Sequence, residues 1–385
     1  MIKHILILAI LFLFLPLGSR ADSPSAFPVE VWAAKPPQPV VADGRVRLVY
    51  ELHLTNISPS PIELKGLDVL GGGGDKPLAA YRDAALEPLL AQVGPRDGAD
   101  KMRAIGGGRA VIVFLDVTLD SGVKAPKMLR HRLTLSITKK DGSILEKTVD
   151  APAVPVVQET AMLLHPPLRG VRWVAFNGLS NPEHRRSTIP VDGTVHIAQR
   201  FAIDWQSLGP DGLPSHGDTK SNANFYCYGA ELLAVADGRV SNVKDGLPDN
   251  GGSNQDRAVP ITLDTIAGNY VMLDLGQGRF ALYAHLQPGS LKVKVGDTVK
   301  AGQVLGLLGN SGNSDAPHLH FHLVDANSPL GAEGIPYVLD SFTQQGISPD
   351  PDAMDAGAAW KPESGATPVV HRNEFPVDRA VVSFP

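Results

Sequence analysis

Short runs of alternating apolar residues, broken by glycine and proline, are the feature that most limits how this chain can fold. From Val46 to Leu54 every second residue is apolar, and Arg47, Glu51 and His53 lie between them. A period of two is typical of a half-buried β-strand. The 39 glycines and 32 prolines among 385 residues supply frequent turns. We therefore predict an all-β protein.

The length and the texture of the chain indicate two β domains after an N-terminal leader, at roughly 150 residues per domain. Residues 22–150 carry short strands between turn signals, which predicts an immunoglobulin-like β-sandwich, with one short helix possible within 81–92. Residues 151–165 are proline-rich and predict a linker. Residues 166–342 predict a second domain built on an antiparallel β-sheet. Residues 343–385 are rich in Pro, Gly, Asp and Ala, and we expect an irregular C-terminal tail.

Residues 1–21 have the pattern of a secretory signal peptide. Lys3 precedes an apolar run from Ile5 to Pro16, and small residues follow at Ser19 and Ala21. The apolar run is shorter than the roughly 20 residues that span a bilayer. We expect cleavage after Ala21, a periplasmic or secreted protein, and no membrane span in the mature chain. A retained membrane anchor is the alternative.

Cysteine content and charge narrow the remaining classes of protein. Cys227 is the only cysteine, so no disulfide can form within the chain. The formal net charge is −5, and the sequence has no clustered basic excess. A nucleic-acid partner is therefore not expected.

Three alternating histidines are the most informative chemical feature. A polar, glycine-containing loop at 309–317 leads into a strand that places His318, His320 and His322 on one face. Side chains at i and i+2 of a strand stand about 7 Å apart. One imidazole could then bind a metal while its neighbour reaches an attacking water or the substrate. Twelve histidines in the whole chain make this alternation improbable by chance.

Two other segments carry residues that are ordinary when taken alone. Alternation over 280–286 places Tyr283 and His285 on one face and predicts that Leu282 and Ala284 are buried on the other. Asp204 follows an apolar stretch within a strand predicted at 197–205. A lone histidine or aspartate in such places is more often structural than functional.

Together these segments resemble the lysostaphin-type (LytM-like) zinc metallopeptidases of peptidoglycan. The resemblance covers residues of about 170–340. Its most specific parts are 283–286 (Tyr-Ala-His-Leu), 309–312 (Gly-Asn-Ser-Gly) and 317–321 (Pro-His-Leu-His-Phe), with a glycine-bearing hairpin at 295–306.

The resemblance implies a peptidase domain of the lysostaphin/LytM type that holds one Zn²⁺ per chain. It also implies hydrolysis of peptide bonds in peptidoglycan stem peptides or cross-links, with peptidoglycan as the partner. By this likeness Asp204 and His320 are metal ligands. His285 and His318 are the catalytic pair that activates water and stabilises the tetrahedral intermediate.

The first metal ligand departs from the family pattern. The family usually has a histidine four residues before the aspartate, and this chain has Arg200 there. A guanidinium group offers no lone pair to a cation. His196 lies eight residues before Asp204, about 26 Å along an unbroken strand, which is too far for one site. His184 lies in an upstream polar loop that can fold back over the strand end.

We therefore predict a metal triad of His184, Asp204 and His320. The alternatives are His196 as the first ligand, a site with only two protein ligands, a different first ligand, or no metal at all. His322 stands where the family often has glutamate, and we expect it to be a structural neighbour of the site.

Two other functions compete with an active hydrolase. A catalytically degenerate LytM-like module would bind the cell wall or activate other murein hydrolases as its partners, and Arg200 favours that interpretation. A biotinyl- or lipoyl-carrier domain would explain the hairpins at 236–240 and 295–303. Its exposed lysine would have to be Lys244, which is followed by a long polar insertion, and this fits poorly.

Overall fold

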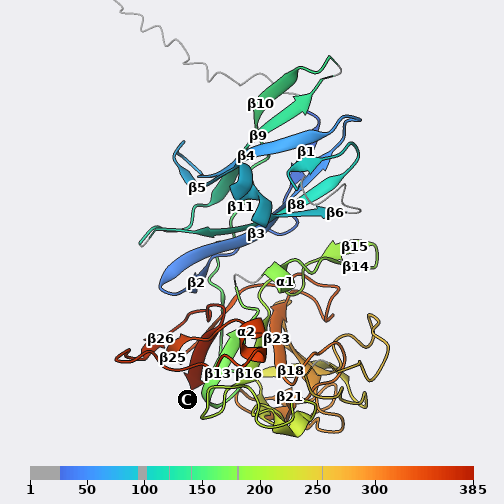
Figure 1. The fold of residues 1–385 in the computed structure, drawn as a ribbon, viewed down its shortest axis with the longest axis vertical. Helices are drawn as coiled ribbons and strands as arrows, with labels where there is room; N and C mark the ends of the chain where they lie inside the picture. The colour runs from blue at the N-terminus through green and yellow to red at the C-terminus, as the bar shows by residue number, and fades with distance from the viewer. Residues whose placement is uncertain (1–26, 94–101, 121, 140, 180–181, 254) are drawn as a thin grey trace, which may run out of the picture.

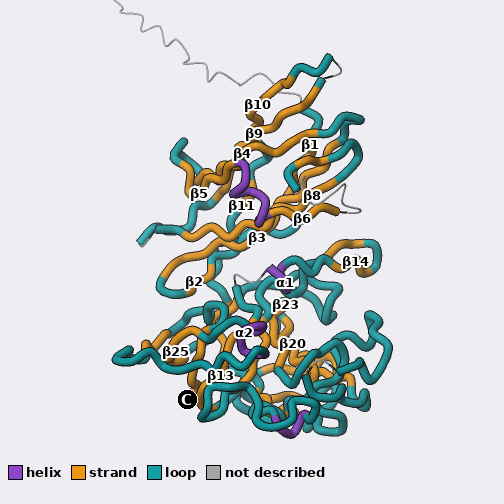
Figure 2. Tube along the Cα trace, viewed as in Figure 1, coloured by secondary structure: helices purple, strands orange, loops and turns teal. Residues whose placement is uncertain are grey.

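The computed structural model describes residues 27–93, 102–120, 122–139, 141–179, 182–253 and 255–385. The signal peptide predicted at 1–21 lies outside these residues. Within them strands dominate, and the helices are short, as Figure 2 shows, which confirms the all-β prediction. None of the helices in the described ranges is long and apolar enough to cross a membrane. They are α1 (Pro182–Arg185), α2 (Pro351–Asp355) and the 3₁₀ turns η1 (Asp83–Leu89) and η2 (Asn222–Asn224).

The N-terminal domain is a two-sheet β-sandwich, as predicted (Figure 1). One sheet has the order β1-β3-β8-β6 with β2 beside β3, and the other has the order β10-β9-β4-β5, with β11 beside β9 and β7 beside β4. The strands of the first sheet are β1 (Val29–Trp32), β2 (Val40–Ala42), β3 (Arg45–Asn56), β6 (Leu90–Val93) and β8 (Ala110–Thr118). Those of the second are β4 (Ile62–Gly71), β5 (Pro77–Arg82), β7 (Ala104–Ile105), β9 (Met128–Thr138), β10 (Ile144–Asp150) and β11 (Val154–Pro155).

The core of this sandwich follows the alternation of the sequence. Leu48, Leu52 and Leu54 of β3 are fully buried against Leu133 and Leu135 of β9. The short helix considered within 81–92 is present as the 3₁₀ helix η1, which lies between β5 and β6. Pro88 lies inside η1 and has no N–H to donate, which disfavours a regular α-helix there.

The second domain is built on one long sheet in which each strand runs antiparallel to its neighbours. Among the described residues its order is β21-β18-β19-β20-β23-β16-β13-β27-β25-β26. Along that order the bounds are β21 (Thr298–Val299), β18 (Gly238–Lys244), β19 (Asn269–Asp274), β20 (Phe280–Leu286), β23 (Leu319–Val324), β16 (Ile203–Ser207), β13 (Gly170–Phe176), β27 (Ala380–Phe384), β25 (Phe342–Ile347) and β26 (Val369–His371). Three smaller pairs flank it: β12 (Met162–Leu164) with β24 (Tyr337–Leu339), β14 (Ile189–Val191) with β15 (Thr194–His196), and β17 (Glu231–Leu233) with β22 (Val304–Leu307).

The segment at 151–165, predicted to be a linker, also carries strands. β11 pairs with β9 of the sandwich, and β12 pairs in parallel with β24 of the second domain. The segment therefore adds a strand to each of the two domains that it joins.

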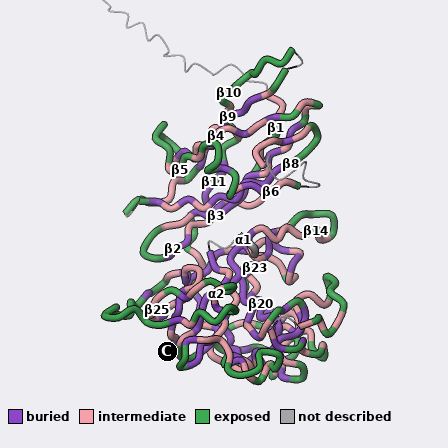
Figure 3. The backbone as a smooth tube through the Cα atoms, viewed as in Figure 1, coloured by how far each residue is buried: buried purple, intermediate pink, exposed green. Residues whose placement is uncertain are grey.

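The outer face of the sandwich packs against the second domain. Val40 and Val49 belong to the same apolar core as the second domain's Phe201. Ile112 and Phe114 of β8 contact Ile197. The helix α1 lies at this junction (Figure 1), and Figure 3 colours segments on both sides of it as buried.

The irregular C-terminal tail expected at 343–385 is wrong. β27 inserts between β13 and β25, where Trp173 pairs with Val382, and β25 and β26 extend the sheet. Glycine and proline between these strands gave the segment its irregular composition. The strands themselves are short, and β25 is largely polar, so only pairing with a distant strand reveals them.

Val382→Asp tests this correction, with Val370→Asp as its matched control. Val382 is fully buried in the core, whereas Val370 on the edge strand β26 is 57% exposed. We expect Val382→Asp to lower the free energy of unfolding by roughly 3 kcal/mol or more, because it buries an unpaired carboxylate. Val370→Asp should change it by less than about 0.5 kcal/mol. Urea unfolding of both variants measures this, and equal stabilities would contradict the position of β27.

Candidate active site

Asp204 and His320 face each other across two paired strands. β16 and β23 pair so that Asp204 lies directly opposite His320. Ile203 and Trp205, on either side of Asp204, are buried in the core, so the alternation of β16 turns the carboxylate to the other face of the sheet. His320 Nδ1 lies 2.8 Å from Asp204 Oδ1.

His184 joins this pair from α1, which precedes β14. His184 Nε2 lies 3.2 Å from Asp204 Oδ2. One ligand atom from each of His184, Asp204 and His320 lies within 4.8 Å of the others. The structure therefore brings the three predicted metal ligands together, although 136 positions of sequence separate the first from the last.

A second layer of contacts fixes the orientation of these three side chains. His320 Nε2 lies 3.0 Å from His322 Nδ1, which agrees with the structural role expected of His322. Asn177 donates a hydrogen bond of 2.7 Å to Asp204 Oδ2. Asn177 has a positive φ of 57° at the end of β13, and nothing in the sequence pattern singled it out.

His285 reaches the same cleft through an irregularity in its strand. Tyr283 is buried in the core, where its hydroxyl accepts a hydrogen bond of 2.8 Å from the backbone N–H of Val235. Leu282 and Ala284 line the cleft instead. The predicted parity, with Tyr283 and His285 on one face, is therefore wrong. His285 has a φ of 66°, and this left-handed conformation turns its ring out of the alternation and into the cleft.

The two predicted catalytic histidines both present Nε2 to the cleft. His285 Nδ1 lies 2.7 Å from the carbonyl oxygen of Ser311, and His318 Nδ1 lies 2.8 Å from that of Ala316. A carbonyl only accepts, so each Nδ1 carries the hydrogen and Nε2 points into the cleft, where that of His318 lies 3.4 Å from Asp204 Oδ1. The two rings have centroids 4.7 Å apart. The cleft has a volume of about 430 Å³ and contains His184, Asp204 and His320 as well.

The glycines of the 309–312 motif allow the loop to approach the end of β20 and the start of β19 closely. A Cβ at Gly309 would lie 2.4 Å from the backbone nitrogen of Gln287, and one at Gly312 would lie 2.3 Å from that of Gly268. Gly312 also has a φ of +75°. The close approach places the carbonyl of Ser311 against His285, so the motif has a physical role in orienting that ring.

Burial and one carboxylate set the charges in the cleft. Burial favours the neutral acid, but the neighbouring His184 and His318 hold the pKa of Asp204 well below its usual range. Burial, followed by the charges of His318 and His320, lowers the pKa of His285 well below that of a free imidazole. Burial also lowers the pKa of His320, despite its contact with Asp204. Burial opposes protonation of His184 and His318 as well, but the neighbouring Asp204 carboxylate outweighs it and raises the pKa of both rings.

Arg200 and His196 lie away from the metal triad. The strand predicted at 197–205 is wrong in its first half: residues 198–201 form turns, and β16 begins at Ile203. Arg200 is buried and pairs with Glu51 and Glu333. His196 Nδ1 lies 3.3 Å from Glu333 Oε1. Neither belongs to the groups of described residues that could hold a metal ion.

The donor set fits zinc. Two imidazole nitrogens and one carboxylate oxygen converge, and His322 orients one of the imidazoles from behind. Three protein ligands beside a cleft match the zinc sites of hydrolases, in which a fourth position is open to water or substrate.

Comparison with known proteins agrees with this architecture. Residues 223–331 match the family model of peptidase family M23. The match includes His285, His318 and His320, whereas His184 and Asp204 precede it. Residues 223–331 are therefore similar to M23 peptidases, and the relatives that match include a peptidoglycan endopeptidase and a glycyl-glycine endopeptidase.

Individual relatives match over part of their length. Peptidoglycan DD-endopeptidase ShyA of Vibrio cholerae is 41% identical over 66 residues, which are 17% of this chain and 15% of ShyA. Glycyl-glycine endopeptidase ALE-1 of Staphylococcus capitis is 34% identical over 114 residues, 29% of this chain and 26% of the relative. The chain thus spans about a quarter or less of these two relatives. The lysostaphin catalytic domain of Staphylococcus simulans is 27% identical, with 33% of this chain and 86% of that chain covered and a TM-score of 0.21.

His184→Ala and His196→Ala, measured side by side, test the first ligand. We expect wild-type protein and His196→Ala to hold one zinc per chain at equimolar metal, because His196 pairs with Glu333 outside the cluster. His184→Ala should hold far less, since it removes one of three ligands. Zinc content after gel filtration gives the answer. Full occupancy in His184→Ala would refute the assignment.

Proposed function

We propose that this protein is a zinc-dependent endopeptidase that hydrolyses peptide bonds in peptidoglycan stem peptides or cross-links. The observation that carries the proposal is the convergence of His184, Asp204 and His320 in one cleft, with His285 and His318 beside them. A binding module has no need of two further histidines beside the metal ligands, each with its Nδ1 held by a backbone carbonyl.

The chemistry follows from the placement of the side chains. Zinc, when bound, supplies a Lewis acid and lowers the pKa of a coordinated water to about 7. His285 and His318 each hold Nδ1–H on a carbonyl and present Nε2. A neutral Nε2 accepts the proton of an attacking water, and a protonated ring donates a hydrogen bond to the oxyanion. His322 and Asn177 keep His320 and Asp204 in place.

The substrate class is proposed from the relatives. ShyA is named as a peptidoglycan DD-endopeptidase and ALE-1 as a glycyl-glycine endopeptidase. Both names specify an endopeptidase, and that of ShyA specifies peptidoglycan. The name of ShyA supports peptidoglycan as the partner of this chain.

The contacts of Arg200 argue against the alternative of a degenerate module. Arg200 suggested a lost ligand, but the buried ion pairs of Arg200 occupy a different place, and His184 fills the position beside Asp204. We therefore favour an active hydrolase over a module that only binds the wall or activates other hydrolases.

His285→Ala and His318→Ala test the catalytic pair. We expect each to slow the release of new amino groups from purified peptidoglycan by roughly 10²–10⁴-fold, which is the usual contribution of a positioned acid or base. Zinc content should stay near one per chain, because neither residue belongs to the proposed triad.

The matched control is His165→Ala, an exposed histidine that pairs with Asp340 outside the cleft, and it should leave the rate unchanged. Chelation should abolish hydrolysis by the wild-type protein, and added zinc should restore it. A wild-type protein that binds zinc yet releases no amino groups would favour the degenerate module.

We also propose that the protein acts in the periplasm or outside the cell, with the β-sandwich as a spacer or docking module. The support is the pattern at 1–21, where an apolar run ends in small residues. We expect the exported protein to begin at Asp22. N-terminal sequencing of protein from a secreting host measures this, and an intact Met1 on membrane-bound protein would instead indicate a retained anchor.

A further inference from the structure

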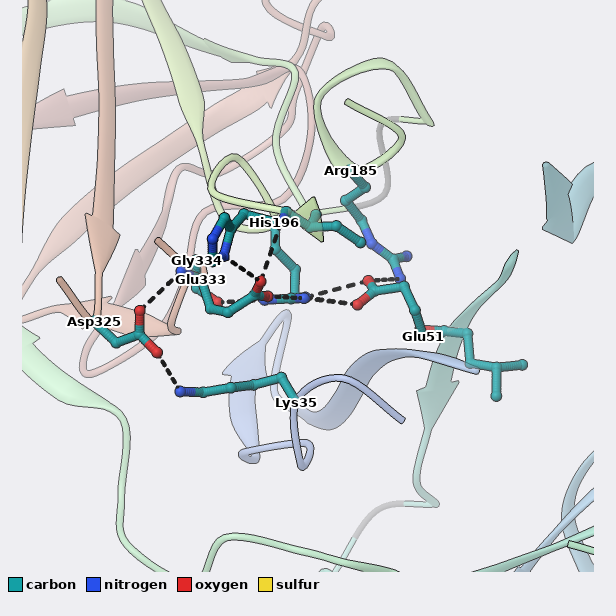
Figure 4. Close-up of polar contacts among 10 residues, drawn as sticks. Lys35, Glu51, Arg185, His196, Asp325, Glu333 and Gly334 are labelled. Carbon is teal, nitrogen blue, oxygen red and sulfur yellow. Dashed lines mark hydrogen bonds and ion pairs between the residues drawn. The ribbon is translucent and has the colours of Figure 1, made fainter. Parts of the chain in front are cut away.

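Glu51 is a buried carboxylate that the β-sandwich directs into the second domain. It lies in the middle of β3, on the face opposite the sandwich core, and its side chain is fully buried. Its oxygens lie 2.8 Å from Arg200 Nη2 and 3.4 Å from Arg185 Nη2 (Figure 4). A buried carboxylate is stable only when such partners are present. The sandwich and the second domain therefore share one charge network.

Residues 184–186 contact both the cleft and the β-sandwich. His184 lies in the cleft, whereas the next two residues contact the sandwich. Arg185 donates a hydrogen bond of 2.9 Å to the carbonyl of Leu115. Arg186 donates one of 3.0 Å to the carbonyl of Leu90 and lies over the ring of Phe114, 5.1 Å from its centre. The segment that carries His184 is thus held from the sandwich side.

The helix α1 cannot set the position of His184 by itself. It has four residues, and a single isolated turn is unstable in water because helix nucleation is unfavourable. The contacts of Arg185 and Arg186 supply what the short helix lacks.

The second partner of Glu51 leads to the strand of Asp204. Arg200 donates a hydrogen bond of 2.8 Å to the carbonyl of Gly334 and forms an ion pair of 2.7 Å with Glu333. It lies three residues before β16 begins. Glu51 therefore contacts Arg185, the residue after His184, and Arg200, which lies in the turn before the strand that carries Asp204.

We propose that Glu51 is a positioning residue of the metal site, which acts through Arg185 and Arg200 to hold His184 beside Asp204. The β-sandwich then completes the metal site of the second domain. This inference rests on the proposed zinc site and adds a residue outside the cleft to it.

Glu51→Gln tests the proposal, because it keeps the shape of the side chain and removes its charge. We expect zinc affinity to fall by about 10–100-fold, which is typical of a residue that orients a metal ligand. The measurement is competition with a chromophoric chelator on the full-length protein.

The matched control is Lys35→Met. Lys35 pairs with Asp325 at 2.5 Å, also between the two domains, and it is linked to Arg200 only through Asp325 and Glu333. Its zinc affinity should equal that of the wild type. A loss equal to that of Glu51→Gln would mean that any weakened domain contact is enough, and would overturn the specific role of Glu51.

A double variant separates positioning from general destabilisation. If Glu51 acts through His184, then Glu51→Gln should change zinc affinity by no more than about twofold when His184→Ala is already present. The full 10–100-fold loss in that background would show that Glu51 acts elsewhere, and the proposal would fall.

A further variant covers the case in which Glu51→Gln does not fold. Arg185→Gln leaves Glu51 paired with Arg200 and removes the contacts of Arg185 with Glu51 and with the carbonyl of Leu115, and it should weaken zinc binding in the same way. Normal zinc affinity in Arg185→Gln would overturn the proposal. A wild-type protein without zinc would overturn the proposed function as well, whereas a zinc-binding wild type with a normal Glu51→Gln variant would overturn this inference alone.

Discussion

The pairing of β16 with β23 is the interaction on which the candidate site depends. It sets one carboxylate, Asp204, directly against the imidazole of His320 in a place from which most water is excluded. An isolated charge there would be costly, so the surrounding groups must compensate it. His184, His318 and Asn177 do so from three other segments. A single, mostly buried negative charge thus organises the surrounding histidine rings.

The long sheet gives that cluster its rigidity. β16 and β23 are flanked on one side by β20 and on the other by β13, and β27 from the end of the chain closes the next position. The C-terminal strands therefore stabilise the strand that carries Asp204, although they contribute no ligand to the triad. On the other side, the left-handed backbone at His285 is held by the glycine loop at 309–312, and backbone strain of this kind is often found at functional sites.

The interface between the two domains consists of buried apolar side chains around the buried ion pairs of Glu51. Val49 and Phe114, on the outer face of the sandwich, are buried against the second domain. Glu51 lies on the same face, paired with its arginine partners. Such an arrangement stabilises only if the ions keep good geometry, because burying charge is costly. It therefore favours one relative placement of the two domains, and with it one position for the segment that bears His184.

Local sequence determined the strands, the turns and the histidine face of β23, because a period of two and glycine punctuation are properties of neighbouring residues. It also pointed to His285 and Asp204, once a family pattern joined the segments. Only the tertiary structure decided which atoms meet. The positive φ of His285, the insertion of β27 and the burial of Glu51 each depend on contacts between residues far apart in the chain. Alternation placed Glu51 between the apolar positions of a half-buried strand, and a second domain covers it, which no local pattern encodes.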